Sequence, residues 1–512
     1  MTDGIALRVN GDTVTVRDEA GSLLDLLRDQ LLLRSAKDGC SPQGQCGCCT
    51  VLVDGAPRVA CVTPVARVTG RDVTTLEGLA PAIRDRWVDA FTATGASQCG
   101  FCTPGIIMRL SALDRVDDTS VGRALLAHLC RCTGWRTIFE AAVDATGEST
   151  SRPARDWERA ARRATIEGGV PQRVGPEVTA GGGRFADDSA PTGAIVAAPL
   201  ADGNGWATGA TVRAARAASG KRQGRRTTAS LRWPIELPEG EWTLTLRTTW
   251  VEPAYLETDA SWARPGGLGA DACANGGAFG GKADSPVERA ASSLAAEHDE
   301  PVRVVWSRED VVRYGPKRPP MAIGVRSDGS GVARVARTPG IVDAIHSIAP
   351  TWIVEEVDVP GPRTSSALRA AGWAEVAVVL AALAGRAEVG APNGARARAT
   401  IDERGVHVRV SCGDSLDSIV LRSYCIGAAH MGLGWVTSEG IAVDDGGEPL
   451  DLTIRSFGII RATEMPVVDV EIEHSDEPAV NGSDAVFAAV AAAAWLAQGC
   501  PPEWPTSRGR QR

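Results

Sequence analysis

The chain has 512 residues, of which 44% are hydrophobic and 23% are charged, as is ordinary for a soluble globular protein of several domains. Its formal net charge of −9 gives no reason to expect a nucleic-acid partner. No run of about 18 apolar residues occurs, so no membrane-spanning helix is predicted. The first residues lack the basic and then apolar layout of a secretory signal, and we expect a cytoplasmic protein.

The N-terminal residues predict a β-hairpin followed by a helix. Residues 5–9 and 13–16 alternate apolar and polar side chains about Asn10-Gly11, a dipeptide that favours a two-residue hairpin turn. The leucines of residues 23–33 recur at helical spacing, which predicts a helix there. Ser22 directly precedes it and can cap its N-terminus.

A cysteine-rich loop comes after this helix. Gly44 and Gly47 suit a backbone that wraps closely around an anion, because glycine has no Cβ. Residues 50–53 and 58–62 predict a second pair of strands, which completes a small β-grasp, ferredoxin-like unit ending near residue 77. The cysteines of this first set are Cys40, Cys46, Cys48, Cys49 and Cys61.

The next segment is predicted to be helical and carries a second set of cysteines. Its four helices are expected over residues 83–92, 105–113, 120–129 and 135–145. Cys102 and Cys130 fall at the ends of these helices, where backbone N–H groups can stabilise a negatively charged cluster. Cys130 and Cys132 are only two residues apart, so the chain between them must bend. The second set consists of Cys99, Cys102, Cys130 and Cys132.

Clustered cysteines can form disulfides, zinc sites or iron–sulfur centres. Disulfides are unusual in a chain without a secretory signal. Zinc sites favour paired C-x2-C spacings, which Cys99 and Cys102 alone would fit. The first set has the spacing C-x5-C-x2-C, which lies close to the plant-type ferredoxin pattern. The two sets therefore favour two iron–sulfur centres, each held by four thiolates.

The rest of the chain carries fewer local signals. A polar stretch at residues 147–153 indicates a linker. We assign residues 148–172 to this linker. Residues 276–282 form a glycine-rich loop that can bring backbone N–H groups to a phosphate or a pterin, although an ordinary glycine turn is equally compatible with the residues alone.

The N-terminal segments resemble the two-cluster [2Fe-2S] subunit of the xanthine dehydrogenase/aldehyde oxidase/carbon monoxide dehydrogenase family of molybdenum hydroxylases. The resemblance implies that Cys99, Cys102, Cys130 and Cys132 hold the cluster beside the molybdenum cofactor, and that Gln98 touches its molybdopterin. It implies that the first set holds the cluster nearer the electron exit. The resembling segments are Leu7-Arg8-Val9-Asn10-Gly11, Gly39-Cys40, Gln45-Cys46-Gly47-Cys48-Cys49-Thr50, Gln98-Cys99-Gly100-Phe101-Cys102-Thr103-Pro104-Gly105 and Cys130-Arg131-Cys132-Thr133-Gly134.

The first set departs from the family pattern. Relatives usually have four residues between the first two cysteines and a small residue in place of Cys48. We expect the ligands to be Cys40, Cys46, Cys49 and Cys61, with Cys48 able to replace Cys49 if the loop shifts. His128 stands where relatives usually carry Asn, and we expect a structural role for it.

The C-terminal part resembles a shortened, divergent molybdopterin-binding subunit of the same family. Gly183-Arg184-Phe185-Ala186-Asp187-Asp188 looks like the opening of that subunit, and Gly432-Leu433-Gly434-Trp435 with Ser438-Glu439-Gly440 looks like a later element. The resemblance implies that molybdopterin, if bound, is held by Gln98, Gly277, Phe279, Gly280, Gly281 and Arg369.

These expectations define an α+β chain of four parts. The predicted parts are a ferredoxin-type β-grasp domain (1–78), a helical [2Fe-2S]-binding domain (79–147), a linker (148–172) and a mixed α+β molybdopterin-binding-like region (173–512).

The catalytic base of the family is missing. Aligning Phe487 with the family places Ser483 where relatives have Glu, with Asp484 one residue away. A Ser hydroxyl is a poor base without a partner, and losing a general base costs about 100- to 10,000-fold in rate. Ser483 also suits a helix N-cap, so the catalytic residue stays unassigned.

Two hypotheses follow from the resemblance. In the first, the chain is a molybdenum-hydroxylase-type oxidoreductase that oxidises an aldehyde or an N-heterocycle, a small-molecule substrate. In the second, it is an electron-transfer subunit whose degenerate molybdopterin region docks to a complete catalytic molybdenum subunit. No FAD domain is recognisable in the sequence, so a flavoprotein subunit or another acceptor would receive the electrons.

Overall fold

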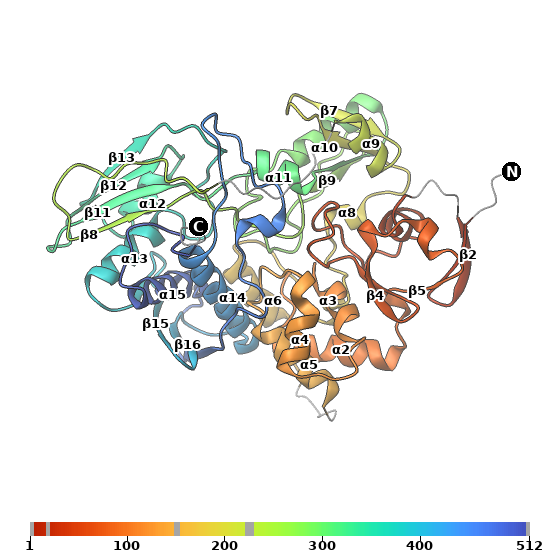
Figure 1. Cartoon of the computed structure of the whole chain (residues 1–512), viewed down its shortest axis with the longest axis horizontal. Helices are drawn as coiled ribbons and strands as arrows, with labels where there is room; N and C mark the ends of the chain where they lie inside the picture. The colour runs from red at the N-terminus through yellow and green to blue at the C-terminus, as the bar shows by residue number, and fades with distance from the viewer. Residues whose placement is uncertain (1–4, 17–20, 148–153, 221–229, 508–512) are drawn as a thin grey trace.

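The computed structural model describes residues 5–16, 21–147, 154–220 and 230–507. The N-terminal strands form a five-stranded sheet in the order β2-β1-β5-β3-β4 (Figure 1). Asn10 and Gly11 turn the first hairpin with positive φ angles of 53° and 93°, which confirms the predicted hairpin. The strands are β1 (Ile5–Val9), β2 (Asp12–Val16), β3 (Thr50–Val53), β4 (Ala56–Val59) and β5 (Asp72–Thr74).

The helix predicted over residues 23–33 is shorter and less regular than expected. α1 (Leu23–Asp25) begins after Ser22, whose hydroxyl accepts the N–H of Asp25 at 3.2 Å, so the predicted cap is confirmed. One π-helical turn, η2 (Leu26–Gln30), follows. The helix ends there because Leu32 has a φ of 56°, in the left-handed region that a right-handed helix excludes.

The strand predicted over residues 58–62 also ends early, at Val59. Residues Ala60–Val62 form a 3₁₀ turn (η3) instead. The turn places the backbone N–H of Cys61 3.4 Å from the sulfur of Cys49, so it joins two cysteines of the first set.

The four predicted helices are confirmed, with their ends shifted by a few residues. The last part of the third predicted helix is a separate 3₁₀ turn, η6 (Leu125–Ala127). This helical part lies beside the β-grasp sheet (Figure 1). The helices are α2 (Pro81–Thr94), α3 (Thr103–Leu110), α4 (Asp118–Ala124) and α5 (Arg136–Thr146).

The described part of the chain beyond residue 153 contains three further sheets, each of four strands. The sheet nearest the β-grasp part has the order β7-β6-β10-β9, from β6 (Ile195–Pro199), β7 (Trp206–Gly209), β9 (Ala260–Ala263) and β10 (Val302–Val305). The next has the order β13-β12-β11-β8, from β8 (Leu244–Arg247), β11 (Met321–Val325), β12 (Gly331–Ala336) and β13 (Ile353–Val357). The last has the order β14-β15-β16-β17, from β14 (Glu388–Gly390), β15 (Arg396–Asp402), β16 (Gly405–Ser411) and β17 (Val468–Glu473).

Helices pack between and around these sheets. Those in the first half of the region are α6 (Trp157–Gly168), α7 (Pro176–Thr179), α8 (Ala186–Ser189), α9 (Val212–Ala218), α10 (Val287–His298), α11 (Arg308–Tyr314) and α12 (Ile341–His346). Those in the second half are α13 (Trp373–Leu383), α14 (Ser418–Thr437), η7 (Ile454–Phe457) and α15 (Ser483–Ala497).

α14 and α15 form the core that meets the cysteine-rich N-terminal part. Both helices are rich in small residues, so their backbones approach closely: a Cβ on Gly432 would lie 2.6 Å from the carbonyl oxygen of Phe487. Trp435 stacks on the Phe487 ring with centroids 5.0 Å apart. α14 is therefore buried over most of its length, and it lies beside α15 in the middle of the molecule (Figure 1).

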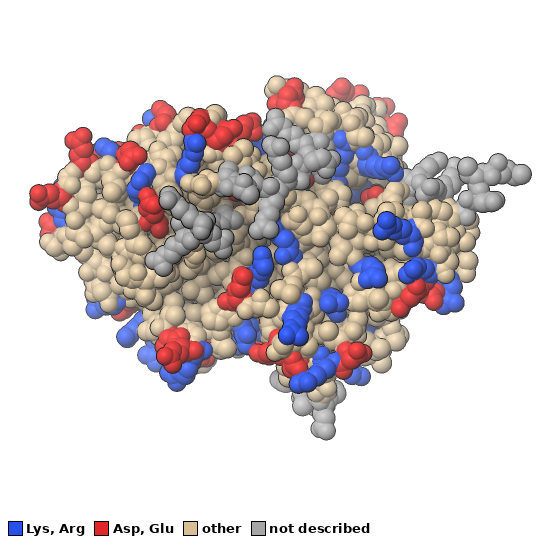
Figure 2. Space-filling model, viewed as in Figure 1, with Lys and Arg blue, Asp and Glu red and all other residues tan. Residues whose placement is uncertain are grey.

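The predicted α+β class is confirmed. The four domain boundaries stay predictions, and residues 148–153 of the expected linker lie outside the described residues. Helix α6 falls within the linker range and packs against α14. No helix in the described ranges is both long enough and apolar enough to cross a membrane. Acidic and basic side chains are interspersed over the face in Figure 2.

Candidate metal and cofactor sites

The first set of thiols converges on one buried loop. The thiols of Cys46 and Cys61 both hydrogen-bond to the sulfur of Cys40, which lowers the pKa of Cys40 and raises that of Cys46. The sulfur of Cys40 also accepts the backbone N–H groups of Gln43 at 3.3 Å and Gln45 at 3.5 Å. Such donors stabilise thiolate charge, so the loop suits an anionic metal cluster.

Cys48 is buried in the same loop, beside Cys46. Its thiol hydrogen-bonds to that of Cys46. A Cβ on Gly39 would lie 3.1 Å from the Cys48 sulfur and 3.2 Å from the Cys46 sulfur. The spare thiol thus hydrogen-bonds to Cys46, and the charge of Cys49 also raises its pKa. The choice of four ligands among these five cysteines stays a prediction.

The second set forms two sulfur pairs. The sulfurs of Cys99 and Cys132 lie 3.7 Å apart. The thiol of Cys102 hydrogen-bonds to Cys130, and this bond lowers the pKa of Cys130 to about 7. Cys102 directly precedes α3, as predicted, whereas Cys130 lies beyond the η6 turn. The chain bends between Cys130 and Cys132, as the spacing required.

The donor chemistry of both sets fits [2Fe-2S] clusters. Each iron of such a cluster takes two terminal thiolates, so a cluster needs two sulfur pairs from buried chain. All the cysteines of both sets are buried. Among the residues that the structure describes, no three His, Cys, Asp or Glu side chains form a site for a single metal ion.

His128 packs against the first loop. A Cβ on Gly47 would lie 2.4 Å from its ring, and its Nε2 lies 3.1 Å from the Thr50 hydroxyl. Burial lowers the pKa of His128 to about 3, so the ring is neutral at neutral pH. This placement agrees with the structural role expected for it.

The residues expected to touch molybdopterin lie close to the second set. Nε2 of Gln98 donates to the carbonyl oxygen of Cys132 at 3.0 Å and to the hydroxyl of Ser423 at 2.9 Å. A Cβ on Gly277 would lie 2.9 Å from the Cβ of Cys99. The glycine loop therefore packs directly on the second thiol set, and both donors of the Gln98 amide are used by the protein.

The rest of the glycine loop meets Arg369. The carbonyl oxygen of Phe279 accepts the backbone N–H of Arg369 at 3.1 Å, and the Arg369 guanidinium lies 5.4 Å from the Phe279 ring centroid. A Cβ on Gly280 would collide with the carbonyl oxygen of Ala367 at 1.8 Å, and one on Gly281 would meet the Tyr255 ring at 2.5 Å. The loop is thus tightly enclosed.

These residues do not fit a complete molybdopterin in this arrangement. The backbone N–H groups of residues 277–280 have no acceptor among the described residues and remain available to an anion. However, the cavity lined by Phe279, Arg369, Arg131 and Glu439 has a volume of only about 40 Å³. A cofactor as large as molybdopterin needs a pocket of roughly 300 Å³ or more.

Ser483 and Asp484, the candidate replacements for the base, are both bound to Arg369. The guanidinium contacts the Ser483 hydroxyl and donates from Nε to Asp484 at 2.8 Å. Burial raises the pKa of Asp484, and the charge of Arg369 opposes this rise. Ser483 is not the N-cap of α15: it is the first helical residue, after Gly482.

Glu167 takes the capping role that was predicted for Ser483. Its carboxylate accepts the N–H of Gly482 at 3.0 Å and that of Ser483 at 2.8 Å, and it also pairs with Arg163. Sequence reasoning missed Glu167, because it lies in the expected linker and more than 300 positions from α15. It also missed the pairing of Arg131 with Glu439, although both belong to motifs that the resemblance singled out.

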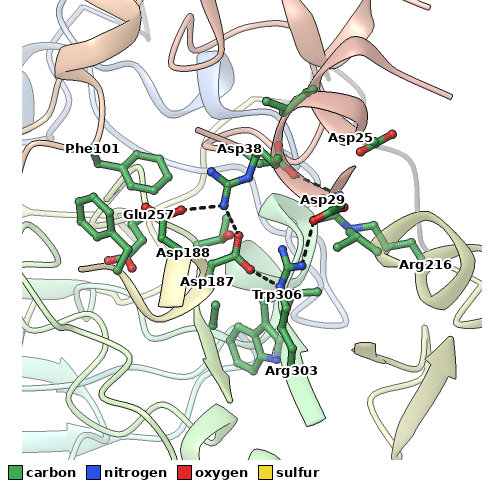
Figure 3. A pocket seen from close by; sticks show the side chains of 17 residues that line it. Asp25, Asp29, Asp38, Phe101, Asp187, Asp188, Arg216, Glu257, Arg303 and Trp306 are labelled. Carbon is green, nitrogen blue, oxygen red and sulfur yellow. Dashed lines mark hydrogen bonds and ion pairs between the residues drawn. The ribbon is translucent and has the colours of Figure 1, made fainter. Parts of the chain in front are cut away.

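A buried ionic seam joins the N-terminal part to the next sheet. Figure 3 shows Arg303 between Asp187 and Asp29, at 2.6 Å and 3.1 Å. Arg28 donates to Asp187 at 2.7 Å. Burial alone would raise the pKa of Asp187, but the charges of Arg303 and Arg28 hold it well below its usual range. Burial raises the pKa of nearby Glu257 to about 7.

Comparison with known proteins supports the N-terminal assignment. A protein-family model described as "[2Fe-2S] binding domain" matches residues 75–143. The chain is 40% identical over 149 residues to the nicotine 6-hydroxylase small subunit of Paenarthrobacter nicotinovorans, covering 28% of this chain and 90% of that one. It is 40% identical over 148 residues to the xanthine dehydrogenase iron-sulfur-binding subunit of Escherichia coli O157:H7, covering 27% and 92%.

Solved structures extend the likeness in fold to the whole chain. The aldehyde oxidoreductase of Desulfovibrio gigas matches with a TM-score of 0.72 and 14% identity, covering 100% of this chain and 99% of that one. The aldehyde oxidoreductase of Desulfovibrio desulfuricans matches with a TM-score of 0.69 and 15% identity, covering 96% and 97%. The sequence matches over the first part and the shared fold confirm the predicted resemblance, and the chain belongs to the xanthine dehydrogenase/aldehyde oxidase family of molybdenum hydroxylases, which are oxidoreductases.

Proposed function

We propose that this chain carries electrons through two [2Fe-2S] clusters in the oxidation of an aldehyde or an N-heterocycle. Cys40, Cys46, Cys49 and Cys61 hold one cluster, and Cys99, Cys102, Cys130 and Cys132 hold the other. The observation that carries the proposal is the convergence of all eight thiols, buried, into two adjacent sets.

The two sets lie close enough for direct electron transfer. α3 begins in the second set and packs on the first loop, because a Cβ on Gly105 would lie 2.4 Å from the carbonyl oxygen of Gly47. The charge of Cys48 also contributes to the raised pKa of Cys102. Electrons therefore pass between the clusters through packed protein.

One thiol of the first set, Cys61, lines a hollow in the protein. A hollow of about 670 Å³ reaches Cys61 and is also lined by Val62, Pro42 and Arg216. This hollow supports electron exit from the first cluster to a flavoprotein subunit or another acceptor. Relatives named as small or iron-sulfur-binding subunits support such a partner.

The substrate class comes from the relatives. Their names refer to nicotine, nicotinate and xanthine, which are N-heterocycles, and the matched structures are aldehyde oxidoreductases. We therefore propose the substrate as a class, an aldehyde or an N-heterocycle.

The site of oxidation is the point on which our two hypotheses differ. The small cavity beside Phe279 and Arg369, of about 40 Å³, favours an electron-transfer subunit that docks to a complete molybdenum subunit. The alternative, in which this chain itself holds molybdopterin, requires that α14 and the glycine loop separate to open the region.

Cysteine variants of the full chain test the two-cluster proposal. Cys102→Ser removes a ligand of one set and Cys49→Ser a ligand of the other. Each variant should lose about half of the iron and one of two electron paramagnetic resonance signals of the reduced protein. Cys500→Ser, outside both sets, is the control and should keep both signals. Loss of the same signal in both variants would contradict the proposal.

A further inference from the structure

We infer that Arg131 and Glu439 form a charge-balancing pair that positions the loop of the second cluster and sets its reduction potential. The inference rests on the proposed function, because it requires a cluster in that loop. Neither residue was expected to contribute to the site.

The pair is buried and bidentate. Arg131 lies between two cluster ligands, Cys130 and Cys132. Its Nη1 and Nη2 atoms donate to the two carboxylate oxygens of Glu439 at 2.5 Å and 2.7 Å, and its Nε donates to the carbonyl oxygen of Pro253 at 3.1 Å. The side chains of Arg131 and Glu439 are 6% and 2% exposed. Arg131 is thus a fixed anchor of the cluster loop.

Helix α14 contacts both the loop that carries Arg131 and the carboxylate of Glu439. A Cβ on Gly427 would lie 1.7 Å from the carbonyl oxygen of Cys132, so the helix backbone touches the loop there. About two helical turns later, a Cβ on Gly434 would lie 2.1 Å from Oε1 of Glu439. The N–H of Glu439 donates to the carbonyl oxygen of Gly434 at 2.7 Å. One face of α14 therefore fixes the carboxylate relative to the cluster.

The pair also balances charge in an enclosed region. Other buried cations of the same region have their own partners: Lys317 pairs with Glu252, Arg318 with Glu375 and Arg369 with Asp484. The small cavity leaves little room for screening water. Neutralising Glu439 therefore leaves the positive charge of Arg131 uncompensated beside the second cluster.

An uncompensated positive charge favours the reduced cluster. Reduction adds one electron, so the reduced cluster carries one more negative charge than the oxidised cluster. A nearby cation stabilises this form, and the midpoint potential rises. Fixing the Arg131–Glu439 pair in place therefore keeps the potential of the second cluster low.

The test is a redox titration of the purified full-length protein, followed by electron paramagnetic resonance. In Glu439→Gln we expect the equilibrium constant for reduction of the second cluster to rise about tenfold, which raises its midpoint potential by about 59 mV for one electron. The potential of the first cluster should stay unchanged. Glu140→Gln is the matched control. Glu140 also makes a bidentate pair with an arginine of α14, Arg422, but that pair is more than one third exposed.

A double variant, Arg131→Gln/Glu439→Gln, removes both charges and should return the potential toward that of the wild type. It also guards against a folding defect, because replacing both partners of a buried pair is milder than removing one. If Glu439→Gln loses only the second cluster and the double variant keeps it, the charge-balancing role is also supported.

Two results would overturn the inference, and they are distinguishable. If the wild type and Glu439→Gln both show two clusters with the same potentials, the pair has no such role and the proposed function stands. If the wild type shows no second cluster, the proposed function fails and the inference fails with it.

Discussion

The thiols of both sets are held by residues that leave them little freedom. The sulfur of Cys130 lies 3.1 Å from the Thr133 hydroxyl, and Gln98 donates to the carbonyl oxygen of Cys132. Because the buried thiols are already held in place, binding a cluster costs less conformational entropy. We therefore expect both sets to keep their geometry in the apo chain.

The buried histidine of α14, His430, should make stability depend on pH. Burial, and then the charge of Arg131, lower the pKa of His430 to about 4, from about 6.5 in the unfolded chain. The unfolded chain therefore binds a proton more readily, and the stability from this group is present above pH 6.5 and is lost as the pH falls toward 4.

His430→Gln tests this dependence. Between pH 7 and pH 5 the wild type should lose about 2 kcal/mol of unfolding free energy that the variant does not lose. The measurement is urea denaturation of both proteins at each pH, and Gln can keep a donor toward the carbonyl oxygen of Ile460 that Nε2 of His430 contacts at 3.0 Å. Parallel pH profiles for the two proteins would contradict the assignment.

At the scale of elements, α14 is the part that connects the cluster loop to the C-terminal region. It contacts the second thiol set through Gly427, Gln98 through Ser423, and α15 through Gly432. Glycines at contact points let the backbones of different elements touch, which side chains would prevent. The helix therefore holds the second thiol set, Gln98 and α15 in place relative to one another.

Gly427→Ala tests this contact. In an exposed helix interior the change should stabilise the helix by about 1 kcal/mol. Here the added Cβ would lie 1.7 Å from the carbonyl oxygen of Cys132, so we expect the second cluster to lose most of its occupancy while the first keeps its own. Iron content and electron paramagnetic resonance measure both.

Ser418→Ala, at the exposed first residue of the same helix, is the control. A normal second cluster in Gly427→Ala would show that α14 does not constrain the loop.

At the scale of the whole molecule, the N-terminal part is joined to the rest by buried ion pairs. Asp187 pairs with Arg303 and Arg28, and Asp29 also pairs with Arg303. Removing one partner of such a pair costs about 3–5 kcal/mol, because it leaves a buried charge without compensation. The seam therefore sets how firmly the N-terminal part is attached.

Asp187→Asn should loosen that attachment. We expect faster amide hydrogen exchange on both sides of the seam, in η2 and β10, with a loss of about 3 kcal/mol in local protection. Asp358→Asn is the control, because Asp358 pairs with Arg337 at the exposed surface. Equal exchange in the wild type and Asp187→Asn would contradict the structural role of the seam.

Much of the N-terminal part could be predicted from the sequence, because its signals are local. Hairpin residues, the Ser22 cap, the helical periodicity and the cysteine spacing all act within a few positions. The same local reasoning was wrong for Ser483, because the carboxylate of Glu167, more than 300 positions away, takes the free N–H groups of α15.

The closed cofactor region could not be predicted for a related reason. Gln98 and Gly277 lie beside the second thiol set, and Arg369 contacts the glycine loop at Phe279. Their partners, such as Ser423 and Asp484, come from distant segments that only the folded chain brings together. The space left between them depends on this packing, which the motifs do not encode.

The most direct test of the account is the metal content of the purified full chain, produced in cells that make iron–sulfur clusters and molybdopterin. The account predicts roughly four iron per chain, from two [2Fe-2S] clusters, and little molybdenum. About one molybdenum per chain would contradict the closed cofactor region, and zinc in place of iron would contradict the two-cluster assignment itself.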